Sequence, residues 1–301
     1  LPETLEVESG GFQMDGETIR ATGLEARTAD AALRVSGALD GLRRGPRKLE
    51  AMVDGETGKE AVRWIWEKAS LPKEFRPAAP IGLREVRVGL GGGESLTLAG
   101  SFTFPNGSRV ALDLIKNGEE TSVRRLTIAD GLSEASISLG LRQSDVEVGF
   151  TGRLAAATMG SLLEKKSQRN GRIEGDFHAL VPRDRLGKAS AGGMLKAADF
   201  EIPTPAGKIT IEALDLRAAS NRVTVNSSSL ALEEQRLSVT GDATFQDEGI
   251  VLDMGVAAGG IAWERVQKVL DRMDAEKKAA GGTRQHESPG TRETEPPPFP
   301  I

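Results

Sequence analysis

Apolar and polar residues alternate along most of the chain, as they do in strands that bury one face and expose the other. The stretch 221–245 shows this well: Val223 and Val225, and later Leu237 and Val239, alternate with residues that are mostly Thr, Ser, Asn and Asp. Two such runs joined by a short polar segment predict a hairpin with one apolar face.

Similar runs recur throughout and predict about eighteen strands. Turn signals such as Asn117-Gly118 and Asp130-Gly131 separate the runs. Strands that follow one another through short turns pair as antiparallel neighbours, whereas parallel pairs need long crossovers. The sequence therefore predicts a mainly β fold built on one long, curled antiparallel sheet.

A short motif, apolar-x-apolar-x-Gly, indicates where this sheet bends. It ends at Gly37, Gly100, Gly152 and Gly241, at irregular spacing, so it does not define a strict repeat. A glycine inside a strand permits a bulge or sharp bend. We therefore expect the sheet to curl at these positions into an open groove.

Three short amphipathic helices are predicted, over 57–69, 153–165 and 262–278. Thr57, with Glu60 three residues later, has the pattern of a capping box at the start of the first helix. From residue 279 the chain is rich in Gly, Pro and Glu. We expect one β-groove region over 1–278, with a possible sub-boundary near 70–80, and a disordered linker over 279–301.

Composition narrows the function. The net charge is −5, so a nucleic-acid partner bound through its phosphates is not expected. The chain has no Cys, which excludes disulfides and thiolate chemistry. Aromatic residues make up 4% of the chain and 36 residues are Gly, which fits a curled sheet with an unfilled interior better than a dry core of this size.

The chain has few side chains or motifs that could support catalysis. Only His178 and His286 carry imidazoles, and His178 is expected on the solvent face of a strand. No His or Cys spacing suits a metal, and the Gly-rich stretch 89–94 is predicted to be a turn between strands rather than a dinucleotide site. The basic cluster 42–48 is read as a charged loop or, alternatively, as a contact for anionic headgroups. We expect no enzyme activity, cofactor or metal.

The predicted apolar faces need cover, which three short helices cannot supply. Either the sheet closes on itself as a dry sandwich or barrel, or it forms an open groove that holds lipid acyl chains. For the open groove, alternation predicts a lining of Leu96, Leu98, Phe102, Phe104, Val146, Val148, Phe150, Val223, Val225, Leu230, Leu232, Leu237, Val239, Phe245, Leu252 and Met254.

The order of elements from about 81 to 265 resembles the AsmA-like proteins of the Gram-negative envelope. The similarity lies in strands that end in Gly, as in "LTLAGSFTF", in a helix after "VEVGFTGRLAAATMGSLL", and in "GIVLDMGVAAGGIAWERV" near the end. It covers roughly two thirds of the chain. The resemblance implies a non-enzymatic, bridge-like lipid-transfer protein whose periplasmic β-groove supports phospholipid passage to the outer membrane, or outer-membrane assembly.

The resemblance also implies partners and a location. The chain would be an internal or C-terminal-region segment of a longer envelope protein, tethered to the inner membrane by an anchor outside this chain. Its partners would be phospholipid acyl chains and the rest of that protein. The alternative that stays open is a dry, β-rich structural module of the cell envelope with no lipid ligand.

Overall fold

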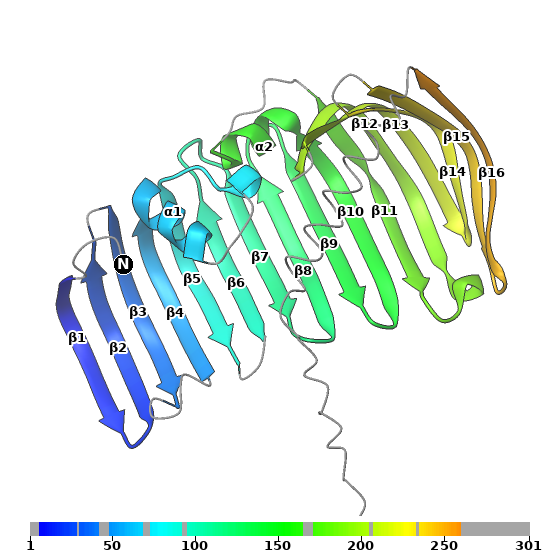
Figure 1. The fold of residues 1–301 in the computed structure, drawn as a ribbon. Helices are drawn as coiled ribbons and strands as arrows, with labels where there is room; N and C mark the ends of the chain where they lie inside the picture. The colour runs from blue at the N-terminus through cyan, green and yellow to red at the C-terminus, as the bar shows by residue number, and fades with distance from the viewer. Residues whose placement is uncertain are drawn as a thin grey trace, which may run out of the picture. The chain divides into compact units, whose positions relative to one another are not determined.

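The computed structural model describes residues 6–28, 30–41, 48–68, 73–91, 95–164, 171–204, 207–232 and 235–259. These residues form one open antiparallel sheet of sixteen strands, in which each strand pairs with the strands before and after it in the chain (Figure 1). The predicted fold class, a mainly β, curled antiparallel sheet, is confirmed. The count within the described residues is sixteen strands rather than about eighteen.

The strands are mostly ten or more residues long. Their bounds are β1 Glu6–Asp15, β2 Thr18–Arg27, β3 Ala31–Asp40, β4 Lys48–Thr57, β5 Ile81–Leu90, β6 Leu96–Thr103, β7 Arg109–Lys116, β8 Glu120–Ala129, β9 Glu134–Arg142, β10 Asp145–Ala155, β11 Arg172–Pro182, β12 Ser190–Thr204, β13 Gly207–Ser220, β14 Arg222–Leu232, β15 Gln235–Gln246 and β16 Gly249–Gly259. At about 4.8 Å between strands, the sheet is roughly 70 Å long across its strands.

Within the described residues, helices are few and short. They are α1 (Lys59–Lys68), α2 (Ala156–Leu162) and two single 3₁₀ turns, η1 (Lys73–Phe75) and η2 (Leu186–Lys188). The third predicted helix, 262–278, and the predicted linker, 279–301, lie outside the described residues. None of the helices in the described part of the chain has the length and apolar character of a membrane span.

The predicted start of the first helix is wrong. Thr57 is the last residue of β4 and is buried, and α1 begins at Lys59. The carboxylate of Asp30, in the β2–β3 turn, accepts hydrogen bonds from the backbone N–H groups of Glu60 and Ala61. A carboxylate distant in sequence therefore satisfies the first-turn donors that a local cap usually takes.

The predicted start of the second helix is also wrong. Strand β10 continues to Ala155, with Arg153 paired to Glu174 and Leu154 paired to Ile173. The helix α2 is thus one short segment after the strand. Leu154 is fully buried, so packing against the sheet outweighs the helical spacing of the sequence.

Glycines allow neighbouring strands to approach closely where the sheet bends. Gly152 has a φ of +107° and pairs with Gly175, whose φ is +155°. A Cβ on Gly152 would lie 2.1 Å from the carbonyl oxygen of Glu134 on the next strand. Gly241, at φ +122°, repeats this arrangement against Asp253. The predicted role of these motif glycines in bending the sheet agrees with this geometry.

The sheet crosses the predicted sub-boundary near 70–80 without a break. Strands β4 and β5 pair directly, from Leu49 with Leu90 to Thr57 with Ile81, and the segment that contains α1 and η1 connects them. Farther along, η2 contacts β15 and β16 although it connects β11 to β12, which shows how strongly the C-terminal half of the sheet curls.

Candidate functional site

One side of the sheet is apolar over its whole length, and the pairing register identifies it. Directly paired residues point to the same side of an antiparallel sheet. Phe150 of β10 pairs with Ile137 of β9 and with Phe177 of β11, and Val223 of β14 pairs with Ala218 and Ala243. We call this side of the sheet, which carries Phe150 and Val223, the apolar face.

The register places most of the predicted lining residues on the apolar face. Phe104 follows Phe102 by two residues and packs against the buried core. The other fifteen stand in these pairs: Leu96 with Leu90, Leu98 with Leu114, Phe102 with Val110, Val146 with Leu141, Val148 with Leu139, Phe150 with Ile137, Val223 with Ala218, Val225 with Leu216, Leu230 with Ile211, Leu232 with Ile209, Leu237 with Leu230, Val239 with Val256, Phe245 with Ile250, Leu252 with Ala243 and Met254 with Gly241. Their contact with lipid stays a prediction.

One irregularity shifts the face within β14. Simple alternation from Val223 would place Ser227 on the apolar face. A register shift between Val225 and Ser228 instead pairs Ser228 with Val239 and Ser227 with Asp215. Because of this bulge, Ser228 and then Leu230 lie on the apolar face.

The apolar face also includes residues that the predicted lining omitted. They come from β1 to β5, from β7 to β9 and from β11 to β13, for example Phe12, Val53, Leu112, Leu126 and Leu216. These residues could have been found in the sequence from the same period-two alternation, combined with the rule that consecutive strands pair. The face is therefore longer than the predicted set of residues.

In the strands near α2, the side chains of the apolar face are buried at one end of the strand and become more exposed along it. Ile128 and Phe150 are 3% and 8% exposed, and both belong to the buried core. Leu139 and Val148, which lie two residues along from the paired Ile137 and Phe150, are each 37% exposed. In these strands near α2, one end thus packs against protein, and the rest of the apolar side is partly exposed.

The buried end is covered by α2. Ala156 and Leu162 of this helix are part of the core cluster, and Met159 packs against it. The strand turns hold the helix in place: Ser133 shares a hydrogen bond with the buried Thr158, between hydroxyl oxygens 2.7 Å apart, and Asn106 donates one to Ser161. The helix therefore closes one rim of the hollow sheet.

A carboxylate anchors the turns beneath α2. Asp130 is partly desolvated, which raises the pKa of its carboxyl. Hydrogen bonds from the Leu132 and Ser133 N–H groups and from the Thr158 and Ser108 hydroxyls outweigh this, so that its pKa lies below the ordinary value. Asp130 therefore stays ionised and fixes the β8–β9 turn against the β6–β7 turn.

The segment before β5 extends the same rim. Pro77 forms a β-bridge with Leu163, just after α2, and the Ala78 N–H donates to the Leu162 carbonyl. Arg76 pairs with Glu164 at 3.0 Å. The segments around α1, η1 and α2 thus form a connected border on one side of the sheet, as Figure 1 shows.

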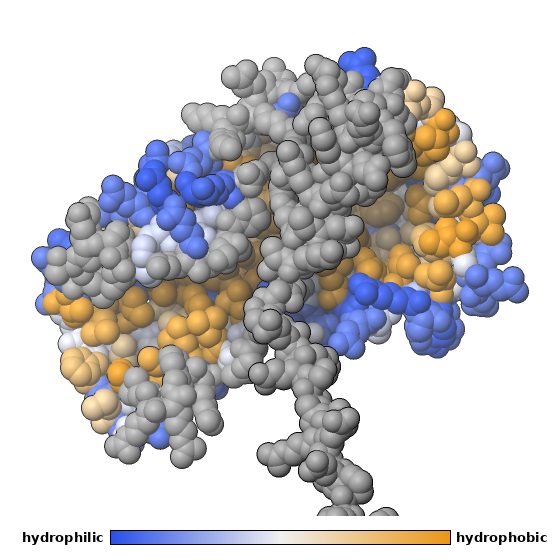
Figure 2. Space-filling model, viewed as in Figure 1, coloured by the Kyte–Doolittle hydropathy of each residue, from blue (hydrophilic) through white to orange (hydrophobic). Residues whose placement is uncertain are grey.

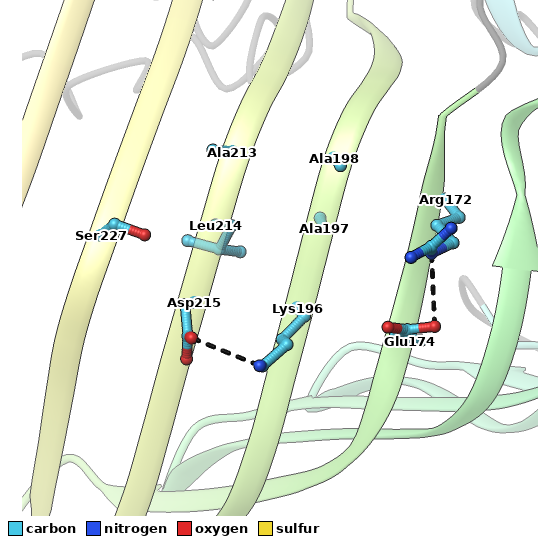
Figure 3. A pocket seen from close by; sticks show the side chains of 9 residues that line it. All are labelled: Arg172, Glu174, Lys196, Ala197, Ala198, Ala213, Leu214, Asp215 and Ser227. Atoms are coloured by element: carbon cyan, nitrogen blue, oxygen red, sulfur yellow. Dashed lines mark ion pairs between the residues drawn. The ribbon is translucent and has the colours of Figure 1, made fainter.

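The outer side of the sheet is polar, and several of its charges form ion pairs. Lys196 and Asp215 lie 3.5 Å apart on adjacent strands, and Arg172 lies 3.4 Å from Glu174 (Figure 3). These residues border a shallow depression of about 230 Å³. Each charge has a partner, so the depression offers no obvious chemistry.

His178 lies on this outer side and is exposed, as predicted. Its neighbours in the ladder are Gly149 and Gly192, over which the imidazole ring packs on the β12 side. In the part of the chain that the structure describes, no three His, Asp or Glu side chains gather as metal ligands would.

The surface view agrees with this division. Apolar residues gather in the hollow of the sheet, and hydrophilic residues lie over α1 and at the lower strand ends on the right of the view (Figure 2). Within the described residues, the arrangement defines a long apolar groove. The helices α1 and α2 border one rim, and no described α-helix borders the other, which we call the open rim.

No protein-family model matches the chain, and neither the curated proteins nor the solved structures include a significant match.

Proposed function

We propose that this chain is a non-enzymatic groove segment that binds phospholipid acyl chains in the periplasm. In this proposal it supports phospholipid transport between the inner and outer membranes, or outer-membrane assembly, as part of a longer envelope protein of the AsmA-like kind. The observation that carries the proposal is the apolar face, which continues over sixteen strands and stays partly exposed away from α2.

The physical argument rests on the free-energy cost of exposing apolar surface to water. An exposed apolar strip of this length is costly to hydrate, and monomeric proteins rarely keep such strips without a ligand or partner. An acyl chain with about fifteen methylenes gains on the order of 10 kcal/mol by leaving water for an apolar surface. A groove of this kind binds lipid tails without recognising a particular head.

The open rim suits the polar headgroup of a phospholipid. Tails would lie on the apolar face around Leu139 and Val148, and the headgroup would stay in water beyond the rim opposite α2. A strand of ten residues is about 33 Å long, and one leaflet of a membrane core is about 15 Å thick. The strands are therefore long enough for an extended tail. Transfer along the groove would be passive.

The first experiment is native mass spectrometry of the full chain after expression in a Gram-negative periplasm, followed by extraction and identification of the lipids. We expect one or more phospholipids per chain. A clean apo mass, together with no uptake of a fluorescent phospholipid, would contradict the proposal and favour the dry structural module.

A matched pair of variants separates the groove from the fold. Leu139→Asp places a charge on the apolar face, and Ser136→Asp places the same charge on the outer side of the same strand. We expect Leu139→Asp to lower lipid content at least about tenfold, because a tail must then displace the water around a carboxylate. Ser136→Asp should leave lipid content unchanged, and both should keep the β circular dichroism signal.

A further inference from the structure

The two edge strands of the sheet differ in a way that points to self-association. Strand β16 pairs with β15 on one side, and within the described ranges no strand lies on its other side; the same holds for β1 beyond β2. An exposed edge presents unpaired N–H and C=O groups, to which another strand can add.

Strand β1 carries the features that block such pairing. Its register against β2 shifts twice within ten residues, around Ser9 and Gly11. It also carries Glu6, Glu8 and Asp15. Bulges and charges of this kind protect an edge from adding a further strand.

Strand β16 lacks these features. Its eleven residues pair with β15 without a shift, from Gly249 to Gly259, and Asp253 is its only charge. Leu252 and Val256 are 62% and 63% exposed. It is a long, regular and apolar edge.

The turn before β16 indicates which backbone groups face outward. Gln246 and Gly249 close a two-residue turn, so they form a hydrogen-bonded pair. Bonded and non-bonded pairs alternate along an antiparallel ladder. Every second residue of β16 from Ile250 to Ala258 therefore turns its N–H and C=O away from β15.

We propose that β16 pairs antiparallel with β16 of a second copy of this chain, centred on Met254. In that register Leu252 stands opposite Val256 of the second copy, so apolar side chains meet on the apolar face. On the outer side Asp253 stands opposite Gly255 of the second copy, so the Asp253 carboxylates of the two copies are not directly opposite each other. The residues that meet at the apolar positions are also those whose N–H and C=O groups face outward.

The symmetry favours this pairing over the alternatives. A strand paired with itself forms a two-fold contact that closes after two copies, whereas β16 against β1 of the next copy would grow without end. The two-fold axis is perpendicular to the sheet, so the apolar faces of both copies join on one side. The inference does not depend on lipid binding, because it rests on the edge and not on what fills the groove.

The test uses the absence of Cys in the chain, which makes a single introduced Cys a clean reporter. Met254→Cys places two thiols opposite each other across the two-fold axis, at a Cα separation of about 5.5 Å that suits a disulfide. Leu252→Cys, the matched control, places its two thiols four residues out of register, more than about 10 Å apart. Both are applied to the full chain under mild oxidation.

Sedimentation equilibrium should show a dimer for the full chain, and only Met254→Cys should give a covalent dimer in high yield. Val256→Pro removes an outward N–H and leaves the β15 ladder intact, so it should raise the dimer dissociation constant at least about tenfold, whereas Val256→Ala should change it less. A monomer at all concentrations, growth beyond a dimer, or equal cross-linking of the two Cys variants would overturn the proposal. A full chain that forms the dimer but carries no bound phospholipid would contradict only the proposed function.

Discussion

Arg222 donates two hydrogen bonds to Asp242 across the β14–β15 pair, from Nε at 2.9 Å and from Nη2 at 2.7 Å. Thr224 donates a third, at 2.6 Å. The Arg222 guanidinium and then the Thr224 hydroxyl lower the pKa of Asp242 from 3.8 to about 2. The pair tethers the outer side of two strands whose inner sides belong to the apolar face.

This relationship predicts a pH dependence of stability. A carboxyl whose folded pKa is depressed stabilises the fold above its unfolded pKa and loses that contribution as pH falls through the folded pKa. The Asp242 contribution should therefore be complete above about pH 4 and disappear towards pH 2. Thermal unfolding of the full chain and of Asp242→Asn should show a Tm difference at pH 5 that shrinks towards pH 2. An equal difference at both pH values would contradict the assignment, and Arg222→Gln should reproduce part of the effect.

The uneven burial of the apolar face predicts two different costs on one strand. Phe150→Ala should destabilise the protein by about 3–5 kcal/mol, because it opens a cavity beneath α2. Val148→Ala, two residues away on the same face, should cost about 1 kcal/mol or less, because that side chain is already partly open to solvent. Urea unfolding measures both. Similar losses would indicate that the groove is dry along its full width.

The close approach of two strands at Gly152 predicts that a side chain at this position destabilises the sheet. Gly152→Ala should destabilise the fold by roughly 2 kcal/mol or more, since φ is positive and the added carbon meets the Glu134 carbonyl. Gly131→Ala is the matched control in a turn, where no atom lies within 4 Å of the added carbon. Its effect should stay within about 1 kcal/mol. Chemical denaturation compares the two, and equal effects would show that the close strand approach at Gly152 is unimportant.

The contact between Asp30 and α1 predicts a local effect. Asp30→Ala should cost about 1 kcal/mol, the usual loss when a helix cap is removed. Hydrogen exchange should speed up first at the amides of Glu60 and Ala61, which lose their acceptor. Unchanged exchange at these two amides would show that the Asp30 carboxylate is not the cap in solution.

The general architecture follows from short-range features of the sequence. Period-two alternation identifies the apolar side of each strand, and short turns imply that consecutive strands pair. For this reason residues as far apart as Leu98 and Val239 could be assigned to one face without knowledge of the fold. Gly152 and Gly241, recognised as the ends of a motif, occupy positive-φ positions in the structure.

The differences arise where distant residues intervene. Thr57 has the local pattern of a cap, but Asp30 fills that role after β3 brings the preceding turn beside β4. Leu154 fits a helical pattern, but pairing with Ile173 keeps it in a strand. The register shift between Val225 and Ser228 inserts one extra residue in β14. From alternation alone, this residue is visible only as a break in the period-two pattern.

The strict order of the strands has a consequence for how such a protein lengthens. Because each strand pairs only with its neighbours in the chain, adding or deleting one hairpin would change the span by about 10 Å and leave the pairing of the other strands intact. Span is then a modular property, adjustable in small steps by duplication, as in repeat proteins. The same order lets the chain assemble progressively from one end as it emerges, because no strand waits for a distant partner.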